Sequence, residues 1–228
     1  AMQYVIIGNS TAATFAVEGI RSRDKRGKIV ILSDEARPAY GRPLISYYLY
    51  GRIALENSAY RPASFYAENA VEVRLNTRAA AVDAEKKRVL LADGSFVPYD
   101  KLLVATGSRP FIPPTAGYES VERKFTFMTM DDALALEREL SPDRRVLVVG
   151  AGLIGLKCVE GILDRVRSVT VVDMADRILS SILDEEGAAL VRRQLEEKGV
   201  RFVLGDRVAE YAGNTARLAG CLLYTSDA

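Results

Sequence analysis

The segments of this sequence best suited to chemistry are two glycine-rich turns, each lying between an apolar run and a helix-type pattern. The second turn, residues 150–155, reads GAGLIG and is a complete G-x-G-x-x-G motif. In such a motif the first glycine allows a tight turn, the second lets a pyrophosphate approach the backbone, and the third lets helix and strand pack closely. The phosphates then lie at the positive end of the helix. The residues predicted to bind a dinucleotide here are Gly150, Gly152, Leu153, Ile154 and Gly155.

Asp173 is the acidic residue expected downstream of this motif. It ends the next apolar run, Val169 to Val172, where its carboxylate can accept hydrogen bonds from the ribose hydroxyls of an adenosine. A 2'-phosphate would meet like charge there, so the pattern favours NADH over NADPH. Arg177, shortly after it, could instead bind a 2'-phosphate. The competing interpretation is a turn that needs its glycines only for packing.

The first turn, residues 8–13, reads GNSTAA and is a degraded form of the same motif. Serine and alanine replace its second and third glycines, and Asp34 follows the next apolar run in the ribose-binding position. This turn alone would be a weak signal. A third motif, ATGSRP at residues 105–110, follows a further apolar run and supports it. The residues predicted to bind this nucleotide include Gly8, Ser10, Ala12, Ala13, Asp34, Ala105, Thr106 and Gly107.

The composition excludes several other kinds of chemistry. The chain has no histidine, which excludes Ser-His and Cys-His nucleophiles and His-ligated metals. Cys158 and Cys221 have no C-x-x-C spacing, so we expect neither a disulfide framework nor a zinc site. Any chemistry must therefore be carried by a cofactor or by other side chains.

The overall balance of residues is typical of a soluble globular protein. Of 228 residues, 49% are hydrophobic and 27% charged, and the net charge is +1, so binding to nucleic acid is not expected. The nearly apolar run from Val146 to Leu156 is shorter than the roughly 20 residues that span a bilayer. The N-terminal residues lack the pattern of a signal peptide, and we expect a cytoplasmic protein without a membrane span.

The turns require strands and helices that position them. Apolar runs at Tyr4–Ile7 and Lys28–Ser33 enclose a helical pattern from Ala13 to Ile20, which predicts one βαβ unit. A second βαβ unit is predicted from Arg145 to Val172. Short β-type runs between residues 79 and 91 predict an antiparallel meander. The expected fold is therefore α/β, with two Rossmann-like nucleotide-binding domains and a small antiparallel meander.

The order of the motifs resembles a known superfamily. Between the first turn and residues 150–155 the chain carries Y-x-R-P-x-x-S from Tyr40, D-x-L-h-h-A-T-G-S-x-P from Asp100 and T-x-x-D-A from Thr129. This order is similar to that of the pyridine nucleotide-disulfide oxidoreductases, and most of all to NADH:rubredoxin reductases and the N-terminal flavin domain of assimilatory nitrite reductases. The resemblance runs from Met2 to about Leu218.

The resemblance implies FAD at the first turn and NAD(P), preferentially NADH, at the second. It adds Arg42, Pro43 and Ala79 to the expected FAD-binding residues, with Arg42 as a donor fork for the pyrophosphate. The implied enzyme passes hydride from NADH to the flavin and electrons to an acceptor, such as a small redox protein or a nitrite reductase centre. The alternatives are an NADH oxidase or peroxidase, and a non-catalytic adenine-nucleotide-binding module.

Several residues depart from the superfamily pattern. Residues 37–50 hold no cysteine, so a dithiol relay is not expected. Lys157 stands where relatives often have a glutamate near the nicotinamide, and Met128 where they commonly have an arginine. We interpret Cys158 as a core thiol. The tyrosines at 40, 47, 48 and 50 could shield a flavin, meet a partner, or simply pack under a loop.

The resemblance also divides the chain. It predicts an incomplete FAD domain over residues 1–114 and an incomplete NAD(P) domain over residues 115–220, so that flavin should be held poorly. Residues 221–228, CLLYTSDA, have no helix or strand pattern and look like a translated sequencing adapter.

Overall fold

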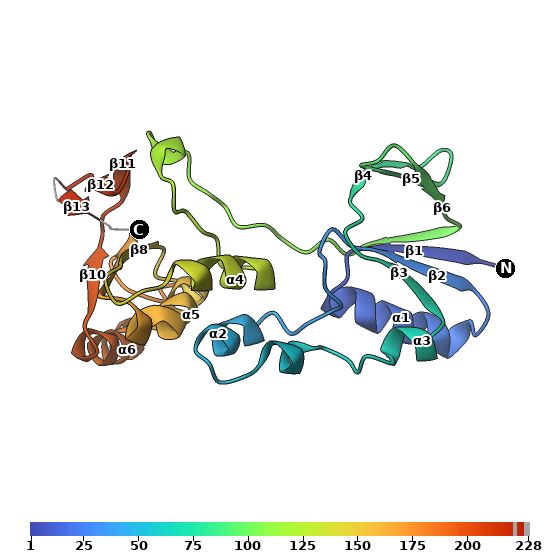
Figure 1. Ribbon diagram of the computed structural model, residues 1–228, viewed down its shortest axis with the longest axis horizontal. Coiled ribbons are helices and arrows are strands. Elements are labelled where there is room, and N and C mark those ends of the chain that lie inside the picture. The colour runs from blue at the N-terminus through green and yellow to red at the C-terminus, as the bar shows by residue number, and fades with distance from the viewer. Residues whose placement is uncertain (221–222, 226–228) are drawn as a thin grey trace. The chain divides into compact units, whose positions relative to one another are not determined.

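A computed structural model describes residues 1–220 and 223–225, the last three by their backbone (Figure 1). The chain forms two compact units. The first comprises Ala1–Leu44 and Ala54–Ser108, and the second comprises Ile45–Ile53 together with the described residues from Arg109 onward. The chain thus passes from the first unit to the second after Leu44 and after Ser108, and a short segment of the N-terminal half belongs to the second unit.

The first unit is built on a parallel sheet with the strand order β3-β2-β1-β7. The bounds are β1 (Gln3–Ile7), β2 (Lys28–Leu32), β3 (Val71–Arg74) and β7 (Lys101–Val104), and α1 (Thr11–Arg23) connects β1 to β2. The first predicted βαβ unit is confirmed. Ile6, Ile29 and Ile31 pack against Ala13 and Val17 of α1, so helix and sheet share one core.

The opposite face of this sheet is covered by the predicted meander. It contains β4 (Ala79–Asp83), β5 (Arg88–Leu91) and β6 (Phe96–Pro98), all antiparallel. Val89 and Val97 pack against Val5 and Val30 from the strands below. Since β1 and β2 are buried on both faces, they need the continuous apolar runs by which they were predicted.

Short helices occupy the irregular segment that follows β2. They are α2 (Leu44–Leu49), the 3-10 helix η1 (Leu55–Ser58) and α3 (Phe65–Glu68). Leu49 of α2 is buried and packs closely over Gly161, where an added Cβ would lie 3.0 Å from a Leu49 methyl carbon. Tyr48 donates to Glu137 across 2.6 Å, and Arg165 also bonds Glu137, at 3.1 Å. These contacts hold Ile45–Ile53 in the second unit.

The second unit has its own parallel sheet, with the order β10-β9-β8. The strands are β8 (Arg145–Val149), β9 (Ser168–Asp173) and β10 (Val200–Leu204). The helices are α4 (Met130–Glu139), α5 (Leu153–Ile162) and α6 (Glu185–Glu197). Two short 3-10 helices, η2 (Tyr118–Ser120) and η3 (Leu163–Arg165), complete the unit's helical elements. The second predicted βαβ unit is confirmed. Val159 and Ile162 of α5 pack against Val169 and Val171 of β9.

Helix ends in this unit follow capping chemistry. The Thr129 side chain accepts the backbone N–H of Asp132 at 3.1 Å, and the Asp132 carboxylate accepts that of Thr129 at 2.9 Å. This reciprocal capping box explains the T-x-x-D pattern structurally. Asp184 caps α6 by accepting the N–H of Gly187 at 2.9 Å.

An antiparallel sheet closes the described chain. It contains β11 (Val208–Ala212), β12 (Thr215–Leu218) and β13 (Leu223–Thr225). The expectation that residues 221–228 form no strand is wrong for Leu223–Thr225, which pair with β12. The predicted adapter origin also concerns residues 221–222 and 226–228, which lie outside the described residues.

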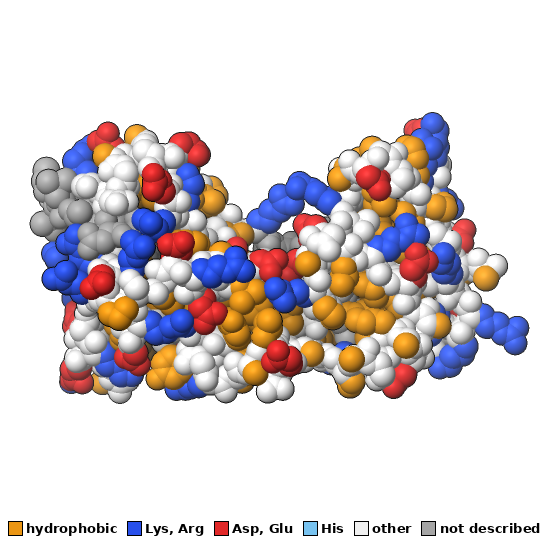
Figure 2. Space-filling view, viewed as in Figure 1, with side chains coloured by type: hydrophobic (Ala, Val, Ile, Leu, Met, Phe, Trp, Pro, Cys, Tyr) orange, Lys and Arg blue, Asp and Glu red, His pale blue; other side chains and the backbone are white. Residues whose placement is uncertain are grey.

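The surface and the helices bear on two further expectations. On the face drawn in Figure 2, basic and acidic side chains are interspersed, as the balanced composition predicts. Among the described residues, no helix combines the length and apolar character needed to cross a bilayer, and no three His, Cys, Asp or Glu side chains cluster as metal ligands would.

Candidate nucleotide-binding sites

The two glycine turns have the same backbone geometry, although only one has the complete motif. Gly8 has φ of 109° and Gly150 has φ of 112°, values that glycine adopts readily and other residues rarely do. Each N–H donates across 2.8 Å to the last apolar residue of the neighbouring strand, Gly8 to Leu32 and Gly150 to Val172. The degraded first turn therefore folds as the second does.

The third motif lies directly against the first turn. Ala105 donates its N–H to Ile7 at 2.8 Å, and a Cβ added at Gly8 would lie 2.1 Å from the Ala105 carbonyl oxygen. Only glycine fits this contact. Thr106 and Gly107 continue from it at the surface, with Gly107 at φ of 69°. The structure thus brings Gly8 together with Ala105 and Thr106 of the third motif.

The small residues of the first turn have different surroundings. Ser10 is the N-cap of α1, and in the described structure its side chain makes no capping hydrogen bond. Ala12 is exposed, whereas Ala13 is fully buried against the sheet and so allows close packing of α1. Asn9 has a buried side-chain nitrogen with no hydrogen-bond partner within the described part of the chain. The turn thus holds one buried donor that no described acceptor satisfies.

The predicted FAD-binding residues outside the turn are spread over the first unit. Asp34 is exposed just after β2, Pro43 is exposed, and Ala79 begins β4. Arg42 pairs with Glu35 and donates to the Tyr40 hydroxyl across 3.2 Å. Tyr40 in turn donates to Glu35 across 2.6 Å. The contact of Arg42 with a pyrophosphate stays a prediction.

The three glycines of the second turn differ in whether the fold itself requires them, which bears on the packing-only interpretation. Gly150 needs its positive φ, and a Cβ at Gly155 would lie 2.1 Å from the Gly150 oxygen, so local structure explains both. Gly152 has φ of −78°, which any residue adopts. Apart from its immediate chain neighbours, no heavy atom of the described residues lies within 4 Å of a Cβ built at Gly152. The fold does not require this glycine, but an approaching phosphate would.

Large apolar side chains around the second turn are exposed. Val149 precedes the turn, and Leu153 and Ile154 form the first turn of α5, each at least half exposed. Met174, at the end of β9, is 73% exposed. Such apolar surface beside free helix N–H groups is suited to a ligand with phosphates and flat rings.

Asp173 has a contact that sequence reasoning missed. Its Oδ2 accepts the N–H of Ala151 across 2.6 Å, and its Oδ1 accepts that of Ala175 across 2.8 Å. The carboxylate therefore orients the glycine turn, and its contact with a ribose stays a prediction. The only sequence signal for this hydrogen bond was the position of an aspartate at the end of the strand next to the turn.

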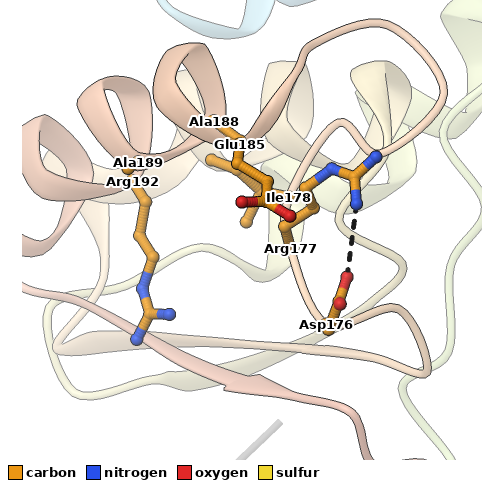
Figure 3. A pocket seen from close by; sticks show the side chains of 7 residues that line it. All are labelled: Asp176, Arg177, Ile178, Glu185, Ala188, Ala189 and Arg192. Atoms are coloured by element: carbon orange, nitrogen blue, oxygen red, sulfur yellow. Dashed lines mark ion pairs between the residues drawn. The ribbon is translucent and has the colours of Figure 1, made fainter.

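Arg177 lies in a pocket of about 200 Å³ between the segment after β9 and α6 (Figure 3). One guanidinium nitrogen is 3.6 Å from Asp176, and another donates to the Ser180 carbonyl across 3.4 Å. Glu185 and Arg192 from α6 line the same pocket. With carboxylates and guanidinium groups mixed, the pocket gives Arg177 no clear role toward a 2'-phosphate.

Cys158 is confirmed as a core thiol. It is buried in the apolar cluster around α5, and this burial raises the pKa of the thiol to about 12. Lys157, next to it, pairs with Glu160 at 2.7 Å and lies 5.4 Å from the centre of the Tyr47 ring. A buried Cys158 thiol with this raised pKa is unreactive at neutral pH.

Comparisons with known proteins agree with this geometry. The family model described as pyridine nucleotide-disulphide oxidoreductase matches residues 2–227. The epsilon subunit of an NADH-dependent phenylglyoxylate dehydrogenase from Aromatoleum evansii is 34% identical over 206 residues, which cover 90% of this chain and 49% of that protein. A rubredoxin-NAD(+) reductase from Pseudomonas putida is 32% identical over 227 residues, covering 99% of this chain and 59% of that protein.

Solved structures give the same picture. A covalent putidaredoxin reductase–putidaredoxin complex matches with a TM-score of 0.90 and 25% identity, covering 99% of this chain and 57% of the matched chain. The chain spans about half the length of the curated relatives it matches.

Proposed function

Since this chain belongs to the pyridine nucleotide-disulphide oxidoreductase family, we propose that it contributes the two nucleotide-binding units of an FAD-dependent NADH oxidoreductase that reduces a small redox protein. The open space at Gly152 is the observation that carries this proposal. A glycine that neither φ nor packing demands, at the start of a ten-residue helix, leaves room for a phosphate at the helix N-terminus.

The first unit would hold FAD and the second NADH. Gly8, Ser10 and the segment from Ala105 to Gly107 surround the first helix N-terminus, and Asp34 follows β2 at the position expected to bind a ribose. When bound, FAD supplies two-electron acceptance from a nicotinamide and one-electron release to a partner. The protein's part is to bind the two nucleotides at fixed turns and to exclude water from them.

The choice of NADH rests on Asp173. Its carboxylate is fixed by two backbone N–H groups, which leaves further lone pairs for ribose hydroxyls. A 2'-phosphate at this position would be repelled by the same charge. We therefore favour NADH over NADPH.

A redox protein is the favoured acceptor because the described part of the chain offers no reactive thiol. Residues 37–50 contain no cysteine, and Cys158 is buried with a raised pKa. Two of the similar proteins are named for rubredoxin and putidaredoxin. An NADH oxidase or peroxidase that depends on a reactive cysteine fits the residues less well.

The test combines binding and reduction. The chain is titrated with FAD and with NADH separately, and the flavin absorbance is then followed after NADH is added without oxygen. We expect saturable NADH binding, FAD binding that is weak, as the sequence predicts, and bleaching of the flavin band once FAD is supplied at saturating concentration. Binding of both without bleaching would favour the non-catalytic nucleotide-binding module, and no FAD binding even at high FAD concentration would refute the proposal.

A further inference from the structure

Tyr66 links segments of the first unit that are far apart in the sequence. Its hydroxyl donates to Asn9 Oδ1 across 3.0 Å, and its oxygen accepts the backbone N–H of Ala39 across 2.9 Å. Asn9 lies in the first glycine turn, Ala39 in the segment after β2, and Tyr66 in α3. One phenol thus connects the turn to the segment that leads from Asp34 to Arg42.

The direction of these hydrogen bonds follows from their donors. The Ala39 N–H can only donate, so the phenol oxygen is its acceptor. The single phenol proton then points to Asn9, which presents its carbonyl oxygen. This assignment places the Asn9 amide nitrogen on the opposite side, where it is buried and has no partner among the described residues.

The Tyr66 ring is held independently of its hydroxyl. It meets the Phe65 ring edge-on, with 5.4 Å between the centroids, and it packs against the core that contains Ala13. A change that keeps the ring and removes the hydroxyl should therefore preserve the packing. The hydroxyl therefore acts on the glycine turn through its hydrogen bonds and is not needed to hold the ring in place.

We propose that Tyr66 is a positioning residue for the nucleotide bound at the first turn. By joining Asn9 to Ala39, its hydroxyl fixes the glycine turn relative to the segment that carries Asp34 and Arg42. A ligand that meets both segments binds more tightly when they are ordered beforehand. This inference rests on the proposed function, because it takes FAD as the ligand of the first turn.

The variant Tyr66→Phe tests the inference, with Tyr4→Phe as its matched control. Tyr4 also loses one hydroxyl contact, to Asp24 at 3.1 Å, but Asp24 follows the C-terminal end of α1, away from the turn. We expect the FAD dissociation constant to rise about tenfold in Tyr66→Phe and to change by less than about twofold in Tyr4→Phe. NADH binding should be unchanged in both, because the predicted NADH residues lie in the second unit, and Tyr4→Phe controls for destabilisation of the first unit.

Hydrogen exchange supplies a readout that needs no ligand. The Ala39 amide should exchange faster in Tyr66→Phe, since its acceptor is removed, but not in Tyr4→Phe. The variant Asn9→Ala removes the other partner, so Tyr66→Phe should weaken FAD binding little further in that background.

The outcomes separate the two proposals. If the parent chain binds FAD and Tyr66→Phe binds it equally well, the positioning role is wrong while the proposed function stands. Equal losses in Tyr66→Phe and Tyr4→Phe, or fully additive effects with Asn9→Ala, also overturn the role. If the parent binds no FAD at all, both proposals fail.

Discussion

The carboxylate of Asp173 accepts the backbone N–H of Ala151, with 2.6 Å between Oδ2 and the nitrogen. Ala151 lies inside the glycine turn and is itself buried, so this N–H faces the protein rather than a ligand. The residue expected to bind a ribose is therefore also a support of the pyrophosphate turn. Changes at Asp173 should affect affinity and selectivity together.

The first prediction concerns Asp173→Asn. The amide oxygen can keep one backbone hydrogen bond, but the negative charge is lost, so NADPH is no longer repelled. We expect the parent chain to favour NADH by at least about tenfold, or roughly 1.4 kcal/mol, and the variant to show a much smaller ratio with weaker NADH binding. Fluorescence titrations with both nucleotides measure the two dissociation constants.

Asp176→Asn is the control for charge. Asp176 lies on the same segment, its side chain is 85% exposed, and it forms an ion pair with Arg177 at 3.6 Å. This variant removes the same charge without touching the turn, so the NADH preference should persist. An unchanged ratio in Asp173→Asn would show that Asp173 does not select the nucleotide.

A second prediction distinguishes a glycine that leaves room for a ligand, Gly152, from one that the packing of the fold requires, Gly155. Gly152→Ala adds a methyl group that meets no described atom within 4 Å apart from those of its chain neighbours, so stability should change by no more than about 1 kcal/mol. NADH affinity should fall by about tenfold or more, because the methyl group fills the space of a phosphate. Thermal unfolding and NADH titration of the same samples measure both effects.

Gly155→Ala provides the contrast. Its Cβ would lie 2.1 Å from the Gly150 oxygen, so we expect loss of the local fold along with binding. Parent-like NADH affinity in Gly152→Ala would support the packing-only interpretation of the turn.

The two βαβ units could be predicted because local signals and burial agree. Strands such as β2 are buried on both faces, and glycines mark the turns that follow β1 and β8. By contrast, β3 reads VEVR and is only partly buried, so its short alternating pattern gave no usable signal. The strands β11 and β12 were missed for the same reason.

The site was predictable in its positions but not in its contacts. The sequence locates Gly8, Gly150 and Asp173 because their spacing follows the motif. It does not reveal that Asp173 holds Ala151, since that depends on the direction of a side chain. The assignment of Ile45–Ile53 to the second unit depends on long-range packing of Leu49 over Gly161, which no local pattern records.

A third prediction concerns the contact between Gly8 and Ala105. Gly8→Ala combines a φ of 109° with a Cβ only 2.1 Å from the Ala105 oxygen, so the strand ends must separate. We expect a loss of about 3 kcal/mol or more. Gly94→Ala has a φ of 86° but open space, and should lose only about 1–2 kcal/mol. Hydrogen exchange of the β1 amides measures both in the first unit, and equal losses would contradict the close contact.

A fourth prediction concerns the thiol of Cys158. Burial raises its pKa from 9.0 to about 12, so at neutral pH the folded chain should hold it as an unreactive thiol. Iodoacetamide should leave Cys158 unmodified, as peptide mass mapping would show, and NADH binding should persist. Rapid modification of Cys158 in the folded chain, with loss of NADH binding, would contradict its placement in the core.

The same shift gives the stability a definite dependence on pH. Because the folded state disfavours the thiolate, the unfolded chain releases this proton first, and the contribution of Cys158 to stability falls as the pH rises from 9.0 towards about 12. Cys158→Ala has no such proton, so its free energy of unfolding should fall less steeply over this range. Urea unfolding of both proteins at several pH values measures the difference between their free energies of unfolding. The titrations of all other groups cancel in this difference because both proteins share them. Parallel curves would mean that the thiol is not buried as the structure shows.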